Sequence, residues 1–274
     1  MELTILVDDT CDVFGLKGEH GFSVYLEDEN HIKVLFDAGS SDVFLKNASN
    51  LGIDLGELDY VVLSHGHDDH IGGIEYLTAL YENNNVKPEL IMHPWALSQR
   101  KNNPENIGAK ISQEKIQKAF KVKKTKDPFW INDKLVVLGE IERKISCESS
   151  FKSGKIVVDG KEIDDYVADD TAIAYNSSKG LVVITGCAHS GIFNIVEQAK
   201  RVCNNDKVYA VVGGLFLVNN HQEQLNSIVK YFKKMPECFL YLCHCTDPFS
   251  RFFLRSNLKK FKEIGVGYGL KFVS

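Results

Sequence analysis

Short apolar runs separated by polar turns recur along the chain, and residues with helical spacing follow several of them. Runs 58–63, 181–185 and 208–212 are each short enough to form a buried strand. Helical spacing follows the first run at residues 74–81 and the second at about 192–202. This repeated order of strand, polar loop and helix predicts an α/β fold.

The N-terminal part of the chain departs from this order. Runs 22–26 and 32–36 are joined by a polar turn at 27–30, which predicts a β-hairpin. A hairpin and strands of mixed length argue against a simple parallel, doubly wound sheet. We expect mixed sheets packed face to face with helices outside, which is a four-layer αββα sandwich. No repeat or low-complexity linker divides the sequence, so residues 1–274 are predicted to form a single domain of two similar halves.

Length and composition are those of an ordinary globular protein. The chain has 274 residues, of which 44% are hydrophobic and 25% charged, enough to bury a sizeable core. A net charge of −5 argues against a nucleic-acid partner, and no apolar run reaches membrane-spanning length. The basic segment 112–126 is interpreted either as a solvated face or as a patch for an anionic ligand.

The cysteines bear on the compartment in which the protein works. There are seven of them, an odd number, and they are scattered along the chain. A strand-like run begins directly after Glu2, so we expect no secretory signal. The thiols are therefore expected to be reduced, in a cytoplasmic protein.

The densest group of chemically active side chains lies in the turn between run 58–63 and helix 74–81. Within six positions it holds three histidines and two aspartates, which are His65, His67, His70, Asp68 and Asp69. Imidazole and carboxylate groups bind zinc or iron, and alternation lets His65 and His67 point the same way. Helix capping explains one aspartate but gives no reason for three clustered histidines. The turn therefore predicts a metal centre.

The pattern His-x-His-x-Asp-His at residues 65–70 resembles the signature of the metallo-β-lactamase superfamily. Three further matches lie elsewhere in the chain, namely Asp37-Ala-Gly, Thr185-Gly-Cys-x-His189 and the late His244. The similarity thus extends over most of the chain. It implies the metallo-β-lactamase-like fold and a dinuclear centre of two divalent ions, with zinc expected and iron or manganese as alternatives.

The resemblance also implies a set of ligands and a mechanism. The ligands would be His65, His67 and His189 on one ion and Asp69, His70 and His244 on the other. Water on or between the ions would lose a proton near neutral pH, and hydroxide would attack a carbonyl or phosphoryl centre. Asp69 or Asp68 would move the proton.

Several residues near these motifs can be interpreted in two ways. Cys187 stands where many members carry a bridging aspartate, and it either binds metal as a thiolate or packs beneath the site. Asp170 falls near the place of a third histidine and is a further candidate ligand. Asp37 either supports the histidine turn or caps a helix. His93 either faces the substrate or caps a turn.

Three more positions complete the candidate site and its surroundings. Gly213 and Gly214 would let an anionic ligand approach the backbone closely. Cys243 and Cys245 flank His244, and alternation along a strand would turn their side chains away from that imidazole. Both thiols are therefore expected to pack in the core.

A closer branch of the superfamily, the dihydropterin ribofuranosylaminobenzene phosphate synthases, is also similar. It shares Thr-Gly-Cys-x-His-x-Gly at residues 185–191, a Gly-Gly strand end and a late His-Cys-Thr. The chain departs from the branch at Phe216, where the branch carries a histidine, and at Asp247-Pro248.

The function predicted from these motifs is that of a metal-dependent hydrolase. Its substrate would be a small anionic molecule of ester or phosphoester type, with neither nucleic acid nor membrane as a partner. The alternatives are a synthase-like transferase, a di-iron redox protein, and a metal-binding protein with little turnover.

Overall fold

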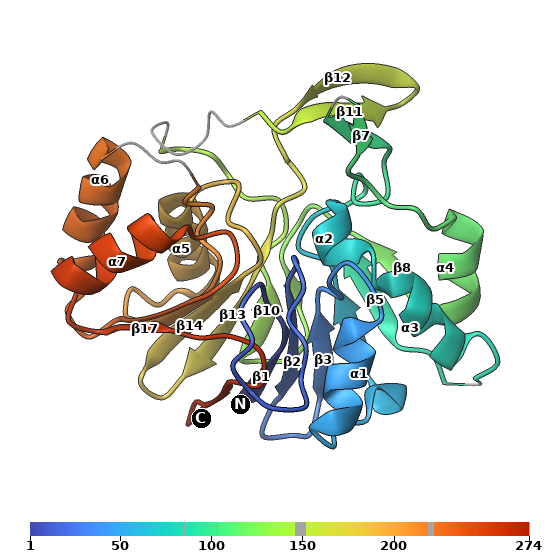
Figure 1. Cartoon of the computed structure of the whole chain (residues 1–274), viewed down its shortest axis with the longest axis horizontal. Helices are drawn as coiled ribbons and strands as arrows, with labels where there is room; N and C mark the ends of the chain where they lie inside the picture. The colour runs from blue at the N-terminus through green and yellow to red at the C-terminus, as the bar shows by residue number, and fades with distance from the viewer. Residues whose placement is uncertain (85, 103, 146–151, 219–221, 274) are drawn as a thin grey trace. The chain divides into compact units, whose positions relative to one another are not determined.

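The computed structural model describes residues 1–84, 86–102, 104–145, 152–218 and 222–273 (Figure 1). The chain divides into two compact units. The first contains Met1–Lys126, Lys152–Asp169 and Gly265–Phe272, and the second contains Asp127–Phe151, Asp170–Ile264 and Val273–Ser274. Cys147, one of the seven cysteines, lies outside the described residues.

The first unit contains a seven-stranded mixed sheet in the order β18-β1-β2-β3-β4-β5-β8. Its strands are β1 (Glu2–Val7), β2 (Ser23–Glu27), β3 (Lys33–Phe36), β4 (Tyr60–Val62), β5 (Glu89–Met92), β8 (Lys121–Lys124) and β18 (Gly269–Lys271). β2 and β3 form the predicted antiparallel hairpin, whereas β3, β4, β5 and β8 run parallel. The C-terminal ends of these parallel strands therefore share one edge of the sheet.

Helices of the first unit pack on this sheet through their apolar faces. They are α1 (Val43–Asn50), α2 (Asp68–Ile71), α3 (Ile74–Tyr81) and α4 (Gln113–Ala119), with a 3₁₀ turn at Leu55–Glu57. One hydrophobic cluster joins Phe44, Leu77 and Ile116 of the helices to Leu35 and Val61 of the strands. Burial of such side chains supplies most of the stability of the layer.

The predicted basic segment 112–126 contains α4 and then β8. Lys121, Lys123 and Lys124 of β8 are exposed, and this strand ends the sheet. Lysines on an edge strand discourage pairing with another chain. The structure thus favours the interpretation of this segment as a solvated face.

A small second sheet of the first unit has the order β12-β11-β6-β7. It consists of β6 (Arg100–Asn102), β7 (Glu105–Asn106), β11 (Gly154–Val158) and β12 (Lys161–Asp165), all antiparallel. The sequence predicts a strand at 156–158, which lies in β11, and irregular structure over the rest of 141–170, which is wrong for β12, the other strand of this hairpin. Its turn, with Asp159 and Gly160 at positive φ, matches a two-residue hairpin connection.

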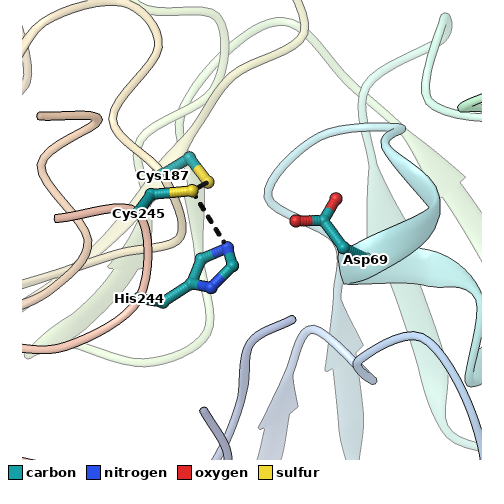
Figure 2. A group of neighbouring side chains, drawn as sticks. All are labelled: Asp69, Cys187, His244 and Cys245. Atoms are coloured by element: carbon teal, nitrogen blue, oxygen red, sulfur yellow. Dashed lines mark hydrogen bonds between the residues drawn. The ribbon is translucent and has the colours of Figure 1, made fainter. Parts of the chain in front are cut away.

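The second unit contains another seven-stranded mixed sheet, in the order β17-β16-β15-β14-β13-β10-β9. The strands are β9 (Phe129–Trp130), β10 (Leu135–Val137), β13 (Ala172–Ser177), β14 (Gly180–Thr185), β15 (Val208–Gly213), β16 (Phe239–Leu242) and β17 (Phe261–Glu263). β14 to β17 run parallel, so their C-terminal turns lie at one edge. The turns after β14 and β16 carry Cys187, His244 and Cys245 (Figure 2).

Three helices pack on the sheet of the second unit, namely α5 (Ile192–Cys203), α6 (Gln222–Phe232) and α7 (Pro248–Asn257). Their buried residues, such as Ile195, Leu225 and Leu254, join one cluster with Val183 and Val211 of the strands. No helix formed by the described residues has the length and apolar character needed to cross a bilayer.

Candidate metal centre

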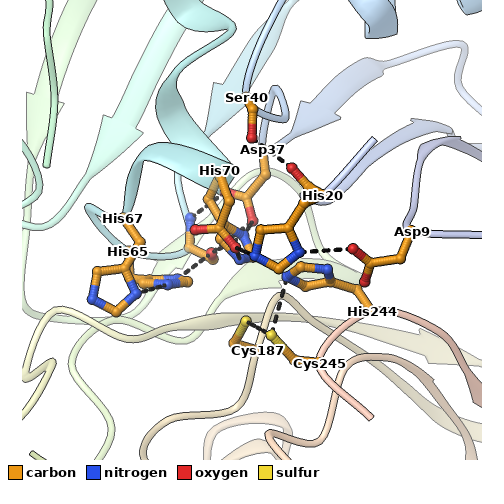
Figure 3. Close-up of polar contacts among 12 residues, drawn as sticks. Asp9, His20, Asp37, Ser40, His65, His67, His70, Cys187, His244 and Cys245 are labelled. Carbon is orange, nitrogen blue, oxygen red and sulfur yellow. Dashed lines mark hydrogen bonds and ion pairs between the residues drawn. The ribbon is translucent and has the colours of Figure 1, made fainter. Parts of the chain in front are cut away.

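Three imidazoles meet in the turn that leads from β4 into α2. His65 and His70 are fully buried, and His67 is 8% exposed. The ring centroid of His65 lies 4.6 Å from that of His67 and 4.1 Å from that of His70 (Figure 3). The turn stands at the C-terminal edge of parallel strands, where open α/β sheets bind their ligands. The first unit therefore brings the three histidines of the motif together.

Neighbouring oxygen atoms orient two of these rings. Ser64 Oγ lies 2.9 Å from His65 Nδ1, and Asp37 Oδ2 lies 2.7 Å from His70 Nδ1. Metal-binding histidines are commonly held in this way, with one ring nitrogen bonded to an oxygen atom behind it. The contacts leave Nε2 of each ring as the atom that faces away from its support.

The remaining ring atoms converge on one another. His65 Nε2 lies 3.0 Å from His67 Nδ1, and His70 Nε2 lies 3.5 Å from Asp69 Oδ2. Imidazole nitrogens and a carboxylate oxygen at such separations are the donors that zinc, iron and manganese accept in proteins. The donor set of this turn therefore fits the divalent ion that the motif predicts.

The third imidazole, that of His67, is held by a residue far away in sequence. Its Nε2 lies 3.0 Å from Ser153 Oγ. Burial, and then the charge of Arg100, lower the pKa of His67 to about 4. The ring is therefore neutral near pH 7, and the neutral ring is the form that coordinates a metal ion.

Asp37 connects the end of β3 with the histidine turn. Its buried carboxylate accepts hydrogen bonds from Ser64 N at 2.7 Å and Ser64 Oγ at 2.6 Å, and it contacts His70. The backbone of Asp37 has a φ of +59°, in the left-handed region that aspartate tolerates better than most residues. It does not cap α1, whose N-cap position is Asp42.

The two aspartates of the motif face different partners. Both lie in the first turn of α2, where a negative charge is favoured by the helix dipole. Asp69 Oδ2 lies 3.5 Å from Nε2 of His20, whose Nδ1 is 2.7 Å from Asp9 Oδ1. Asp68 Oδ2 instead lies 3.7 Å from the exposed Lys110 Nζ. Asp69 is thus the aspartate directed at the imidazoles.

A buried ion pair holds the backbone between the first two histidines. Gly66 N donates to Asp169 Oδ2 at 2.8 Å, and Arg100 Nη2 donates to Asp169 Oδ1 at 2.6 Å. Arg100 Nε also donates to Asp165 Oδ2 at 2.8 Å. Burial alone would raise the pKa of Asp169, but the charge of Arg100 holds that pKa below its usual value. The histidine turn is therefore anchored to an ionised, buried network.

His93 lies in the turn after β5 and is buried. Trp95 N donates to its Nδ1 at 3.1 Å, and the two ring centroids are 5.4 Å apart. An Nδ1 that accepts a hydrogen bond leaves the proton of a neutral ring on Nε2. The predicted role of His93 toward a substrate stays a prediction.

In the second unit, His189 lies in the turn after β14 beside an aromatic ring. Its centroid is 4.3 Å from that of Phe216, and Ala188 before it has a φ of +60°. Asp170 accepts a hydrogen bond from Ser190 N at 2.8 Å and another from Ser190 Oγ. Asp170 therefore contacts the turn that carries His189 through its neighbour Ser190.

Gly213 and Gly214 permit a close packing of strand ends within the second unit. A Cβ atom on Gly213 would lie 2.0 Å from Thr185 O, and one on Gly214 would lie 2.6 Å from both Gly186 O and His244 O. No side chain fits such distances, so the packing of these turns itself requires glycine. The predicted approach of an anionic ligand to these glycines stays a prediction.

Cys187, Cys245 and His244 lie together in the second unit (Figure 2). Cys245 Sγ is 2.8 Å from Cys187 Sγ and 3.1 Å from His244 Nε2. The expectation that Cys245 packs in the core away from His244 is wrong. Its φ of +51° breaks the alternation of an extended strand, so its side chain turns toward the imidazole. Cys243, in contrast, is fully buried.

Five residues that contact the candidate site were not predicted as part of it, namely His20, Arg100, Ser153, Asp169 and Cys245. Four of them lie far along the sequence from the turn that they contact. The acidic run at 164–170 was the available signal for Asp169, because buried carboxylates require a cation nearby.

The chain is similar to known proteins over nearly its whole length. The model of the Metallo-beta-lactamase superfamily matches residues 16–147. An uncharacterized protein of Methanocaldococcus jannaschii is 33% identical over 245 residues, which is 89% of this chain and 90% of that protein. The 7,8-dihydropterin-6-methyl-4-(beta-D-ribofuranosyl)-aminobenzene-5'-phosphate synthase of the same organism is 30% identical over 268 residues, which is 93% of this chain and 90% of the synthase.

A solved structure gives the same result for the fold. The crystal structure of a metal-dependent hydrolase of the beta-lactamase superfamily matches with a TM-score of 0.85 and 30% sequence identity. The match covers 100% of both chains. The α/β fold predicted from the repeated order of strand, polar loop and helix is therefore confirmed.

The anchoring of the histidine turn predicts that Gly66→Ala destabilises the protein. A Cβ at this position would lie 1.7 Å from Arg100 Nη1 and 2.2 Å from the backbone oxygen of Ala96. We expect a loss of about 1–3 kcal/mol in the free energy of unfolding, measured by urea denaturation. The matched control is Gly269→Ala, because the nearest atom to its Cβ is Leu3 O at 3.9 Å. Equal midpoints for the two variants would contradict the prediction.

The contacts of Asp37 predict that Asp37→Asn weakens metal binding. Asparagine tolerates the left-handed backbone but carries no charge to orient His70. Loss of such a supporting carboxylate lowers metal affinity by about 10–100-fold, which chelator competition measures. Asp42→Asn, which changes a partly exposed carboxylate paired with Lys46, is the control and keeps the wild-type affinity. Unchanged affinity in Asp37→Asn would refute the supporting role.

Proposed function

The chain belongs to the metallo-β-lactamase superfamily, and we propose that it is a metal-dependent hydrolase of a small anionic ester or phosphoester. One observation carries this proposal most directly. In the histidine turn, His65 Nε2 and His67 Nδ1 lie 3.0 Å apart while Ser64 and Ser153 hold their other nitrogens. Two buried imidazole nitrogens so close together, each on a ring held from its other side, suit a divalent ion between them.

The proposed ligands in the first unit are the residues of the motif, namely His65, His67, Asp69 and His70. A bound divalent ion would lower the pKa of water and polarise a carbonyl or phosphoryl oxygen. Zinc is the ion proposed first, with iron and manganese as alternatives, because imidazole and carboxylate serve all three. On the basis of the family resemblance, we also propose a dinuclear centre. Its further ligands would be His189, His244 and Cys187.

The protein side chains supply orientation and proton transfer. We assign proton transfer to Asp69 rather than Asp68, because Asp69 faces the imidazoles and Asp68 faces Lys110. His20 Nε2 lies 3.5 Å from Asp69 Oδ2, and the His20 side chain is 72% exposed. It therefore provides a route for the proton toward water. Asp37 keeps the Nε2 atom of His70 directed away from the β3 turn.

A synthase-like transferase is the second candidate function. The identity of 30% to the synthase of M. jannaschii supports it, and the phosphate in the name of that relative supports an anionic ligand. The chain nevertheless carries Phe216 beside His189, at the place where the synthase branch carries a histidine. This change replaces a polar side chain by an apolar one next to a candidate ligand, which favours hydrolysis of a different substrate.

Metal removal and replacement test the proposed function. Treatment with a chelator should abolish turnover on a panel of chromogenic esters and phosphodiesters, and zinc, manganese or iron should restore it. Elemental analysis of the untreated protein identifies the native ion. Parallel incubation with a dihydropterin pyrophosphate and the ribosyl acceptor tests the synthase. Protein that stays inert on the whole panel with every metal supplied would refute the hydrolase.

A substitution in the histidine turn gives a sharper test of the same proposal. His65→Ala should lower kcat/KM at least about a hundredfold, since loss of a ligand costs more than loss of its supporting residue. His31→Ala removes an imidazole that is 84% exposed and should leave kcat/KM unchanged. If His65→Ala kept wild-type turnover, the histidine turn would not be the reaction centre.

A further inference from the structure

We propose that Cys245 acts with Cys187 and His244 as a thiolate-rich metal site within the second unit. The site would take a thiophilic divalent ion such as zinc or cobalt. This inference depends on the proposed function in one respect only, which is that the chain binds a divalent metal ion. It adds a ligand, Cys245, so that sulfur atoms supply two of the three donors in this group.

The three donors come from two turns that the sheet places side by side. Cys187 follows β14, whereas His244 and Cys245 follow β16, and both strands run parallel to β15 between them. Cys245 Sγ lies 2.8 Å from Cys187 Sγ and 3.1 Å from His244 Nε2, and all three donor atoms lie within 4.8 Å of one another. One ion can therefore reach all three with small movements of the side chains.

The backbone of Cys245 is held in the conformation that directs its sulfur inward. Its φ of +51° is uncommon for a residue with a Cβ. Leu217 N donates to Cys245 O at 2.8 Å, and Leu217 also bridges to Thr246. The surrounding turn thus imposes this conformation, and strain of this kind is characteristic of functional sites.

Other thiols of the unit behave as ordinary packed residues. Burial raises the pKa of Cys203 to about 11 and that of Cys238 to about 12, so both remain protonated. Neither belongs to a group of metal-binding side chains among the described residues. Cys187 and Cys245 differ because they lie against each other and an imidazole.

The bond lengths of zinc sites predict how the distance between the two sulfur atoms changes when zinc binds. Zinc–sulfur bonds of about 2.3 Å in a tetrahedron place two sulfurs about 3.8 Å apart. The sulfurs are 2.8 Å apart here, so metal binding would separate them by about 1 Å. Two cysteines and one histidine supply three of the four ligands of a tetrahedral zinc ion.

Cobalt substitution of the full-length protein tests the site. Reduced, chelator-stripped protein is titrated anaerobically with Co²⁺, and we expect a near-ultraviolet band from sulfur-to-cobalt charge transfer. Cys245→Gly, which removes the sulfur and suits the left-handed backbone, should lower this band by about half, because one of two thiolates is lost. Cys187→Ala should do the same. Cys243→Ala, which changes the cysteine on the other side of His244, should leave the band unchanged.

A measurement on the unmodified chain complements these variants. Alkylation by iodoacetamide, followed by mass spectrometry, should show that Zn²⁺ slows the reaction of Cys245 and leaves that of Cys11 unchanged. This test holds even if a variant fails to fold.

The outcomes separate this inference from the proposed function. Bound cobalt without the band, a band unchanged in Cys245→Gly, or alkylation of Cys245 unaffected by zinc would overturn the thiolate site alone. A Cys187–Cys245 disulfide that forms in place of metal binding would also overturn it. The band in a protein without hydrolytic turnover would support the site and refute the hydrolase. Protein that binds no cobalt would overturn the thiolate site, whereas the hydrolase would be refuted only by absence of turnover with zinc, manganese and iron.

Discussion

The arrangement of the histidine turn in the first unit depends on the hydrogen bonds of one buried carboxylate, that of Asp37. It is fully excluded from water, and it accepts hydrogen bonds from the backbone and hydroxyl of Ser64 while it contacts His70. A buried charge is tolerated only where such partners compensate for lost hydration. The end of β3 and the turn after β4 must therefore keep their relative positions. The imidazoles of that turn are held in place with it.

Much of the fold followed from periodicity because its central strands are uniformly apolar. β14 was predicted at 181–185 and extends over Gly180–Thr185, and β15 is equally close to its predicted bounds. The C-terminal part was less predictable. The sequence predicts a helix over about 249–262, but α7 ends at Asn257 because Leu258 is extended, and Phe261–Glu263 pairs with β16. Such pairing with a distant strand overrides the local preference for helix.

The candidate site was predictable where its residues are close in sequence. The motif at 65–70 places its donors through a single turn, so spacing alone indicates a metal centre. Contacts such as Ser153 with His67 depend on tertiary folding between segments 86 residues apart, and no local pattern encodes them. The sulfur of Cys245 was misjudged for a different reason, because strand alternation does not apply to a residue with positive φ.

The Arg100 network has a consequence for how this protein can diversify. Arg100 begins β6, Asp165 ends β12, and Asp169 follows it, so one guanidinium joins the small antiparallel sheet to the backbone of Gly66. Loops near reaction centres are usually the parts that relatives exchange freely. Here, replacing the β11–β12 hairpin would also remove Asp165, one of the two carboxylates that neutralise the buried guanidinium of Arg100. New specificities built on this scaffold would have to retain the base of that hairpin and vary only its outer tip.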